Sequence, residues 1–138
     1  MAFHAEAAGD GPAALRHASA AARRAAALAS PREAAAQFER ALRFTDGTDP
    51  AAVASLHDGF AYEASLLDHW QEAAAARERA LALWRQVGDP LREGDTLRWL
   101  ACSLCSLSRA VRHSPPPGPR PDAEELPCGG TPVLSSWR

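Results

Sequence analysis

Proline recurs in this chain at the spacing of short helices. Before residue 115, prolines stand only at 12, 31, 50 and 90, and Trp70 lies where the one gap in the series falls. Proline suits the first turn of an α-helix, where its missing N–H would have no intrahelical partner. Helix starts therefore recur every 19 or 20 residues, and pairs of helices every 39 or 40. Such a period is typical of an α-helical repeat array, whose units pack on one another.

The residues around these prolines predict how the helices begin and end. Ser30 and Glu33 form a capping box, in which each side chain can accept a backbone N–H near the other. Asp49 and Asp89 precede their prolines as N-cap carboxylates, and Gly88 can adopt the left-handed conformation that stops a helix. We expect an all-α fold with helices near 12-29, 31-45, 50-67, 70-87 and 90-111.

A direct repeat within the sequence supports this array. Residues 33–44, EAAAQFERALRF, and residues 72–83, EAAAARERALAL, are identical at eight of twelve positions at an offset of 39. Small residues at fixed spacing let two helices approach closely, and larger residues fill the gaps between them. The positions that set the pattern are Ala34, Phe38 and Ala41 in the first copy and Ala73, Arg77 and Ala80 in the second.

The first helix of each pair carries a matching small residue. Ala22 and Ala61 lie twelve positions before Ala34 and Ala73, and Leu100-Ala101 offers the same large-small slot in a third copy. Ala-x3-Phe-x2-Ala on the second helix resembles the tetratricopeptide pattern. This chain departs from it in a period longer than the usual 34 or so residues, in lacking the Trp-Leu-Gly signature, and in placing an arginine where an aromatic is expected. The resemblance implies antiparallel helix hairpins stacked as an α-solenoid.

A closer resemblance, over roughly residues 12–109, is carried by residues 32–44, by residues 74–100 and by Ser108-Arg109. These segments are similar to the helical-repeat region of actinobacterial LuxR-type, ATP-dependent transcriptional regulators. The resemblance implies an array that binds a protein, a peptide, a small effector or a neighbouring domain. In such regulators the array signals to a P-loop ATPase domain and a helix-turn-helix domain whether its ligand is bound. A free-standing protein-binding adaptor and a non-functional truncated remnant are the alternatives.

In the tetratricopeptide pattern, certain positions of each first helix face the binding groove. Arginine and tyrosine are favoured anchors at interfaces. The alternative is that these residues are ordinary exposed polar side chains. The resemblance places in the groove Arg16, Ser19, Arg23, Ser55, Asp58, Tyr62, Asp95, Arg98 and Cys102.

Composition argues against several other classes. A net charge of −2 and a pI near 6.2 give no basis for direct nucleic-acid binding. The longest uncharged apolar stretch, 99–108, has ten residues and is too short to cross a membrane. Residues 1–11 show no basic region followed by an apolar core, so we expect no secretory signal there. Three cysteines, an odd number, favour a reducing cytoplasm over a disulfide framework.

Catalytic and metal motifs are weak. Cys102 and Cys105 form a CxxC within a helix, and Cys128 and His113 could join them only at a spacing that no known metal site uses. A zinc deaminase would need strands and a proline before the CxxC. The chain has no lysine, so it has no P-loop. We therefore expect no enzyme activity, no cofactor and no metal.

The third copy has a first helix but no second. We expect a flexible N-terminus over 1-11 and a repeat domain over 12-111. Seven of the eleven prolines fall in a tail over 114-138, which we expect to be disordered. The abrupt change suggests a truncated gene or a tail translated out of frame. The helix over 90-111 then leaves an apolar face uncovered, which predicts self-association. This face comprises Leu97, Leu100, Leu104 and Leu107.

Overall fold

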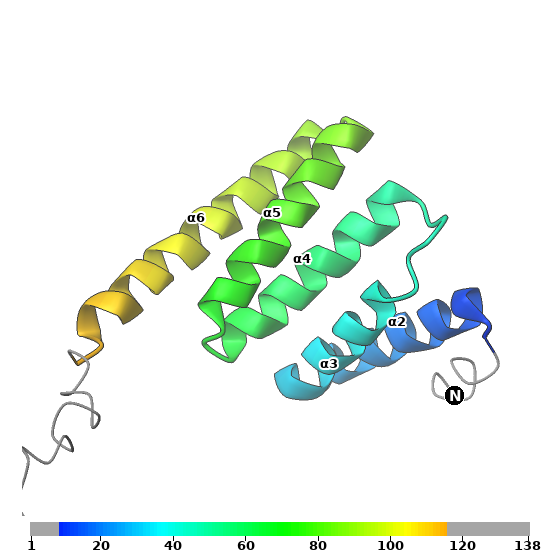
Figure 1. Ribbon diagram of the computed structural model, residues 1–138, viewed down its shortest axis with the longest axis horizontal. Helices are drawn as coiled ribbons and strands as arrows, with labels where there is room; N and C mark the ends of the chain where they lie inside the picture. Colours follow the sequence, from blue (N-terminus) through cyan, green and yellow to red (C-terminus); the bar gives the residue numbers. More distant parts are fainter. Residues whose placement is uncertain (1–8, 116–138) are drawn as a thin grey trace, which may run out of the picture.

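The computed structural model describes residues 9–115, and over these residues the chain forms α-helices and no strand (Figure 1). The predicted all-α class and the five expected helices are confirmed. Most of the predicted N-terminal segment over 1-11 and of the tail over 114-138 lies outside the described residues. The helices are α2 (Gly11–Ala27), α3 (Pro31–Leu42), α4 (Pro50–Leu66), α5 (Trp70–Val87) and α6 (Pro90–His113).

Each helix packs mainly against the next one along the chain. Figure 1 shows α4, α5 and α6 side by side, with the pair α2 and α3 beside the α4 end of this group. Four of the helices begin where the sequence predicts, and α2 begins one residue earlier. The predicted end of α3 at residue 45 is wrong, because the helix stops at Leu42 and a loop leads to Pro50.

Carboxylates cap only some of the helix starts. Asp89 accepts the backbone N–H of Arg92 at 3.1 Å, as predicted. The predicted capping box at Ser30 is wrong, because Ser30 makes no capping bond. Glu33 instead accepts a hydrogen bond from the amide of Gln37 at 2.8 Å, one turn further along α3. Asp49 also makes no capping bond.

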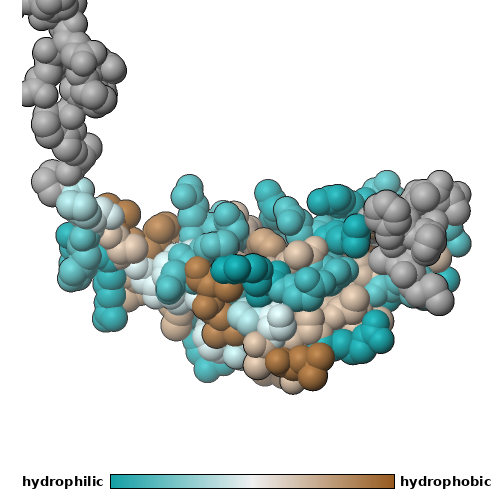
Figure 2. All heavy atoms as spheres, turned by 90° about the horizontal axis from the view of Figure 1, so that it is seen from below, coloured by the Kyte–Doolittle hydropathy of each residue, from teal (hydrophilic) through white to brown (hydrophobic). Residues whose placement is uncertain are grey.

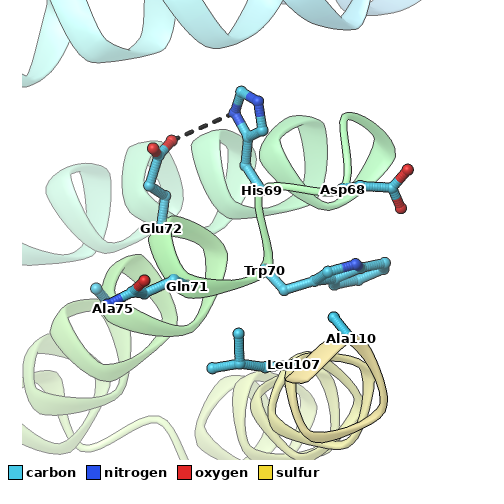
Figure 3. Close-up of a pocket in the computed structure, with 8 residues that line it drawn as sticks. All are labelled: Asp68, His69, Trp70, Gln71, Glu72, Ala75, Leu107 and Ala110. Atoms are coloured by element: carbon cyan, nitrogen blue, oxygen red, sulfur yellow. Dashed lines mark ion pairs between the residues drawn. The ribbon is translucent and has the colours of Figure 1, made fainter. Parts of the chain in front are cut away.

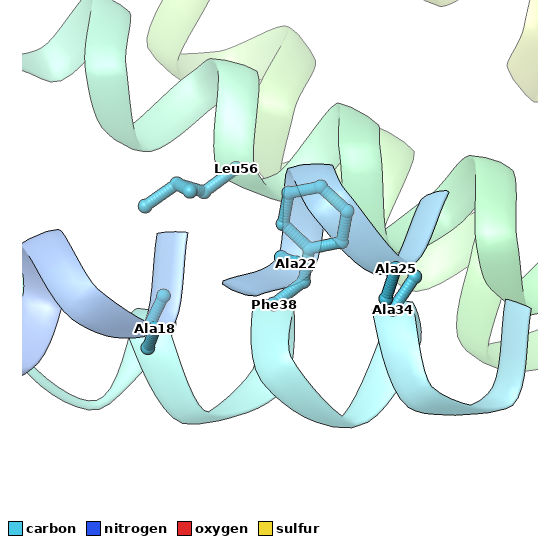
Figure 4. Close-up of a cluster of buried hydrophobic side chains, with 7 residues drawn as sticks. Ala18, Ala22, Ala25, Ala34, Phe38 and Leu56 are labelled. Atoms are coloured by element: carbon cyan, nitrogen blue, oxygen red, sulfur yellow. The ribbon is translucent and has the colours of Figure 1, made fainter. Parts of the chain in front are cut away.

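The main hydrophobic cluster consists of small residues around one aromatic ring. Phe38 of α3 is 6% exposed and projects toward Leu56 of α4 (Figure 4). Alanines keep the three backbones close, and the ring fills the space that they leave. The cluster comprises Ala18, Ala22, Ala25, Ala34, Phe38, Ala41 and Leu56.

The two copies of the sequence repeat occupy similar environments. All six positions that set the pattern are buried, including the charged side chain of Arg77. The third copy departs from the prediction, because Ala101 is exposed. On α6 the buried residues are Thr96 and Ser103, which at an offset of 39 correspond to His57 and Ala64 of α4. Of these two, only Ala64 is itself buried, so the burial pattern of α4 is not repeated on α6, whose buried positions carry hydroxyl side chains.

Gly59 of α4 is needed for the packing of Phe38. A Cβ at Gly59 would lie 2.6 Å from Cζ of Phe38 and 2.7 Å from Cε1, so the buried ring would have to move. We expect Gly59→Ala to lower the free energy of unfolding by about 1 kcal/mol or more, because overpacking outweighs the better helix propensity of alanine. Gly94→Ala on α6 is the matched control, because nothing lies within 4 Å of its added Cβ. That variant should be more stable than the parent by about 0.5–1 kcal/mol. Urea denaturation measures the free energy of unfolding of both variants. An equal change in the two would mean that the ring of Phe38 does not constrain position 59.

Glu63 of α4 is 5% exposed, and burial raises the pKa of its carboxyl. The folded chain then binds this proton more tightly than the unfolded chain. The group's contribution to stability is complete below its unfolded pKa of about 4.3 and is lost as the pH rises through the folded pKa. We expect Glu63→Gln to have a higher Tm than the parent at about pH 7 and little difference near about pH 3. Glu78→Gln, on the exposed side of α5, is the control. A gap in Tm that stays constant with pH would contradict the assignment.

Hydrophobic side chains also reach the surface. Figure 2 shows them in brown between hydrophilic side chains in teal. On α6, Leu97 is 41% exposed and Leu104 is 44% exposed, as expected for a face without a covering helix, but Leu100 and Leu107 of the same expected face are partly buried. Among the helices of residues 9–115, none has the length and the apolar character that a membrane span requires.

Candidate binding site between α4, α5 and α6

Asp58 of α4 is the centre of a polar network that joins three helices. Its carboxylate accepts hydrogen bonds from Arg77 Nη1 at 2.5 Å and from Trp84 Nε1 at 2.9 Å, both on α5. The hydroxyl of Thr96 on α6 lies 3.2 and 3.3 Å from the two carboxylate oxygens. The side chain of Arg77 is only 6% exposed, so its charge depends on Asp58 for compensation.

His57 lies next to Asp58 and is partly buried. Burial is the main cause that lowers the pKa of its imidazole, and the charge of Arg79 lowers this pKa further. Asp58 acts in the opposite direction but does not reverse the shift. His57 is therefore neutral at pH 7, and the positive charge beside Asp58 is that of Arg77.

Trp99 of α6 gathers aromatic and cationic side chains around it. The guanidinium carbons of Arg77 and Arg98 lie 5.7 and 5.5 Å from the centroid of its ring. The ring of Tyr62 meets the indole edge-to-face, with centroids 6.1 Å apart. Both contact types are favourable for an indole, whose face is negative and whose edge is positive.

A pocket of about 300 Å³ opens beside this group, between α4, α5 and α6. Its walls are largely apolar and aromatic. The hydroxyls of Ser65 and Ser103 line it but donate to backbone carbonyls of their own helices, at 2.6 and 3.0 Å. The pocket therefore suits an apolar or aromatic group better than a strongly polar one. Its larger lining residues are Tyr62, Leu66, Trp70, Arg77, Trp99 and Cys102.

A second pocket, more open and of about 500 Å³, lies between the start of α5 and the last turns of α6. Figure 3 shows the indole of Trp70 extending toward Ala110, with Leu107 nearby. His69 and Glu72 form an exposed ion pair at 3.4 Å on its rim. Trp70 lines both pockets and separates them.

The structure brings together some of the residues expected in the groove. Tyr62 and Cys102 line the smaller pocket, and Arg98 stacks on Trp99 while it pairs with Asp95 at 3.6 Å. Asp58 points into the polar network instead. The remaining residues do not line this pocket: Ser19 is buried on α2, Ser55 is partly buried on α4, and Arg16 and Arg23 are exposed on α2.

Sequence reasoning missed the roles of Trp70, Arg77 and Trp99. One signal for them was available, since Arg77 replaces the aromatic residue that the repeat has at Phe38. Cys102 and Cys105 are free thiols and both are exposed. Within residues 9–115, no three His, Cys, Asp or Glu side chains gather as metal ligands, and Cys128 lies outside this range.

No protein-family model, no curated protein and no solved structure matches this chain significantly.

Proposed function

We propose that this chain is a non-catalytic interaction module that binds a protein or peptide on the face shared by α4 and α6. On this proposal the helices pair as antiparallel hairpins and stack as a tetratricopeptide-like α-solenoid, with α2, α4 and α6 forming the inner side. The observation that carries the proposal is the pocket between α4, α5 and α6, to which the expected groove residues Tyr62 and Cys102 both contribute.

The side chains that line the pocket support binding of a partner rather than catalysis of a reaction. Its aromatic walls can bury a partner's apolar side chain, and such buried contacts provide most of the binding energy at interfaces. Exposed Arg98, which stacks on Trp99 of the pocket wall, can pair with an acidic group of the partner, which favours correct docking and a faster association rate.

Selection of random peptides displayed on phage against the full chain tests this proposal. Selected peptides should lose about tenfold or more in affinity for Tyr62→Ser, because the edge-to-face contact and one wall of the pocket are lost. Glu78→Gln, exposed on α5, is the control and should bind unchanged. Peptides that bind the parent and Tyr62→Ser equally well would place recognition elsewhere and contradict the proposal.

We also propose that the array belongs to the regulatory type found in LuxR-type ATP-dependent regulators, with a cytoplasmic location. The support is the similarity of the amino-acid sequence in residues 32–44 and 74–100 to that of such arrays. Sequencing the flanking DNA tests this proposal. Reading frames for a P-loop ATPase and a helix-turn-helix next to this gene would support it, and unrelated neighbours would argue for a free-standing adaptor.

Self-association through α6 is part of the same proposal. Leu97 and Leu104 lie on one side of α6 and are each about two-fifths exposed. We expect Leu97→Glu/Leu104→Glu to shift the chain toward monomer in sedimentation velocity at micromolar concentrations, because charges on the face oppose its burial. Leu91→Glu is the control, since Leu91 is exposed elsewhere on α6. A parent chain that is already monomeric would contradict the proposal.

A further inference from the structure

The two copies of the sequence repeat differ at three linked positions. At an offset of 39, Phe38 of α3 corresponds to Arg77 of α5, and Gly59 of α4 corresponds to Arg98 of α6. At the same offset, Ser19 of α2 corresponds to Asp58. All three changes lie along one junction, where two helices of a pair meet the helix that follows them.

In the first copy an aromatic ring fills this junction. The ring of Phe38 lies among residues of α2, α3 and α4, and it packs against the backbone at Gly59. Any Cβ at that position would lie 2.6 Å from the ring. The first copy therefore needs glycine opposite the ring, and the side chain of Phe38 itself fills its junction.

In the second copy the ring is absent. Arg77 directs its guanidinium to the carboxylate of Asp58, and Arg98, which has a Cβ, occupies the position of Gly59. The space beside them is the 300 Å³ pocket, lined by Trp70 and Trp99. The pocket thus lies at the junction that Phe38 fills in the first copy.

We propose that this pocket receives the aromatic side chain of a peptide partner, which takes the place that the ring of Phe38 holds in the first copy. This inference rests on the proposed function and names the chemistry of its partner. Because Trp99 lines the pocket and lies under the guanidinium of Arg98, the partner carries an acidic residue next to the aromatic one, where it can pair with Arg98. The ion pair of Arg98 with Asp95 is long, at 3.6 Å, and both side chains are more than half exposed.

An aromatic ring suits this pocket better than an aliphatic side chain. Edge-to-face contacts with indole and phenol rings add to the apolar burial that any side chain would obtain. The guanidinium of Arg77 already lies over one ring, that of Trp99, and a second ring beside it gains a similar contact. A phenyl or indole group also fits within the volume of the pocket.

Protection of Cys102 from alkylation provides the test, because Cys102 is exposed and lines the pocket. The full chain carries Cys105→Ser and Cys128→Ser, so that Cys102 is the remaining thiol. The probes are two blocked pentapeptides, one with phenylalanine and one with leucine between two glutamates. We expect the phenylalanine peptide to slow the reaction of Cys102 with a maleimide, with an affinity about tenfold higher than that of the leucine peptide. A chain with Cys105 as its remaining thiol should show no protection.

Variants that fill the pocket give the second part of the test. Asp58→Ser/Arg77→Phe/Arg98→Gly copies the first junction into the second. Ser106 of α6 also lines the pocket, so Ser106→Phe adds a ring with a single change. Protection by the phenylalanine peptide should be lost in both variants, and circular dichroism would show that each remains helical. If the triple variant does not fold, Ser106→Phe decides the question alone.

The outcomes separate this inference from the proposed function. No protection by the phenylalanine peptide up to millimolar concentration, or equal protection by both peptides, overturns the aromatic assignment. Unchanged protection in Ser106→Phe overturns it as well. In each case, display-selected peptides that still depend on Tyr62 would leave the proposed interaction function standing.

Discussion

Replacing Phe38 by alanine is expected to lower the free energy of unfolding by about 3–5 kcal/mol. The ring is almost fully buried, and its neighbours in the cluster are alanines and Leu56. Alanine side chains are too short to close the cavity, so little of the lost contact can be recovered. Small domains have total stabilities of about 5–15 kcal/mol. The variant should therefore be largely unfolded, or close to it, in a urea titration followed by circular dichroism.

Leu66→Ala on α4 is the control for Phe38→Ala. Leu66 is 55% exposed, so its truncation should cost less than about 1 kcal/mol. A cost for Phe38→Ala below about 1 kcal/mol would mean that the junction of α2, α3 and α4 is not held by this ring.

Asp58→Ala is expected to be nearly as damaging, with a loss of about 3–5 kcal/mol. The substitution leaves the guanidinium of Arg77 buried without its carboxylate. It also removes the acceptor for the indole N–H of Trp84 and for the hydroxyl of Thr96. Since these donors lie on α5 and α6, the packing of both helices against α4 should weaken.

Two comparisons make the prediction for Asp58 specific. The ion pair of Arg85 with Glu93 has a similar N–O distance of 2.7 Å but is exposed, so Glu93→Ala should cost less than about 1 kcal/mol. In a double-mutant cycle, Asp58→Ala/Arg77→Met should recover much of the loss, because no buried charge remains. Strictly additive effects of Asp58→Ala and Arg77→Met would show that the two groups do not interact.

The helix starts could be predicted from the sequence because proline acts locally, through its fixed φ and missing donor. Cap hydrogen bonds were less predictable. Ser30 and Glu33 have the spacing of a capping box, but Gln37 competes for the carboxylate one turn away. The early end of α3 at Leu42 was also missed, because the apolar pattern continues to Phe44 while the backbone already leaves the helix.

The site was predictable only in part for a geometric reason. The resemblance to the tetratricopeptide pattern placed Tyr62 and Cys102 in the groove, and both line the pocket. The resemblance could not show that Asp58 points toward Arg77, since that depends on how α4, α5 and α6 are rotated against one another. The same rotation decides that Ala101 is exposed while Ser103 is buried. The exchange of Phe38 for Arg77 was visible in the sequence, but its effect on the junction required coordinates.

The buried side of α6 has a consequence for dynamics. Its only fully buried residues are Thr96 and Ser103, which bring hydroxyl groups to the interface instead of large apolar surface. We expect a helix with so little buried apolar surface to open locally at a smaller free energy than the rest of the fold, so its amide protons should exchange first. Because α6 forms one wall of the pocket, a ligand that bridges α4 and α6 is coupled to this opening equilibrium. Occupancy would slow amide exchange along α6, and stronger attachment of α6 would prolong the residence of the ligand.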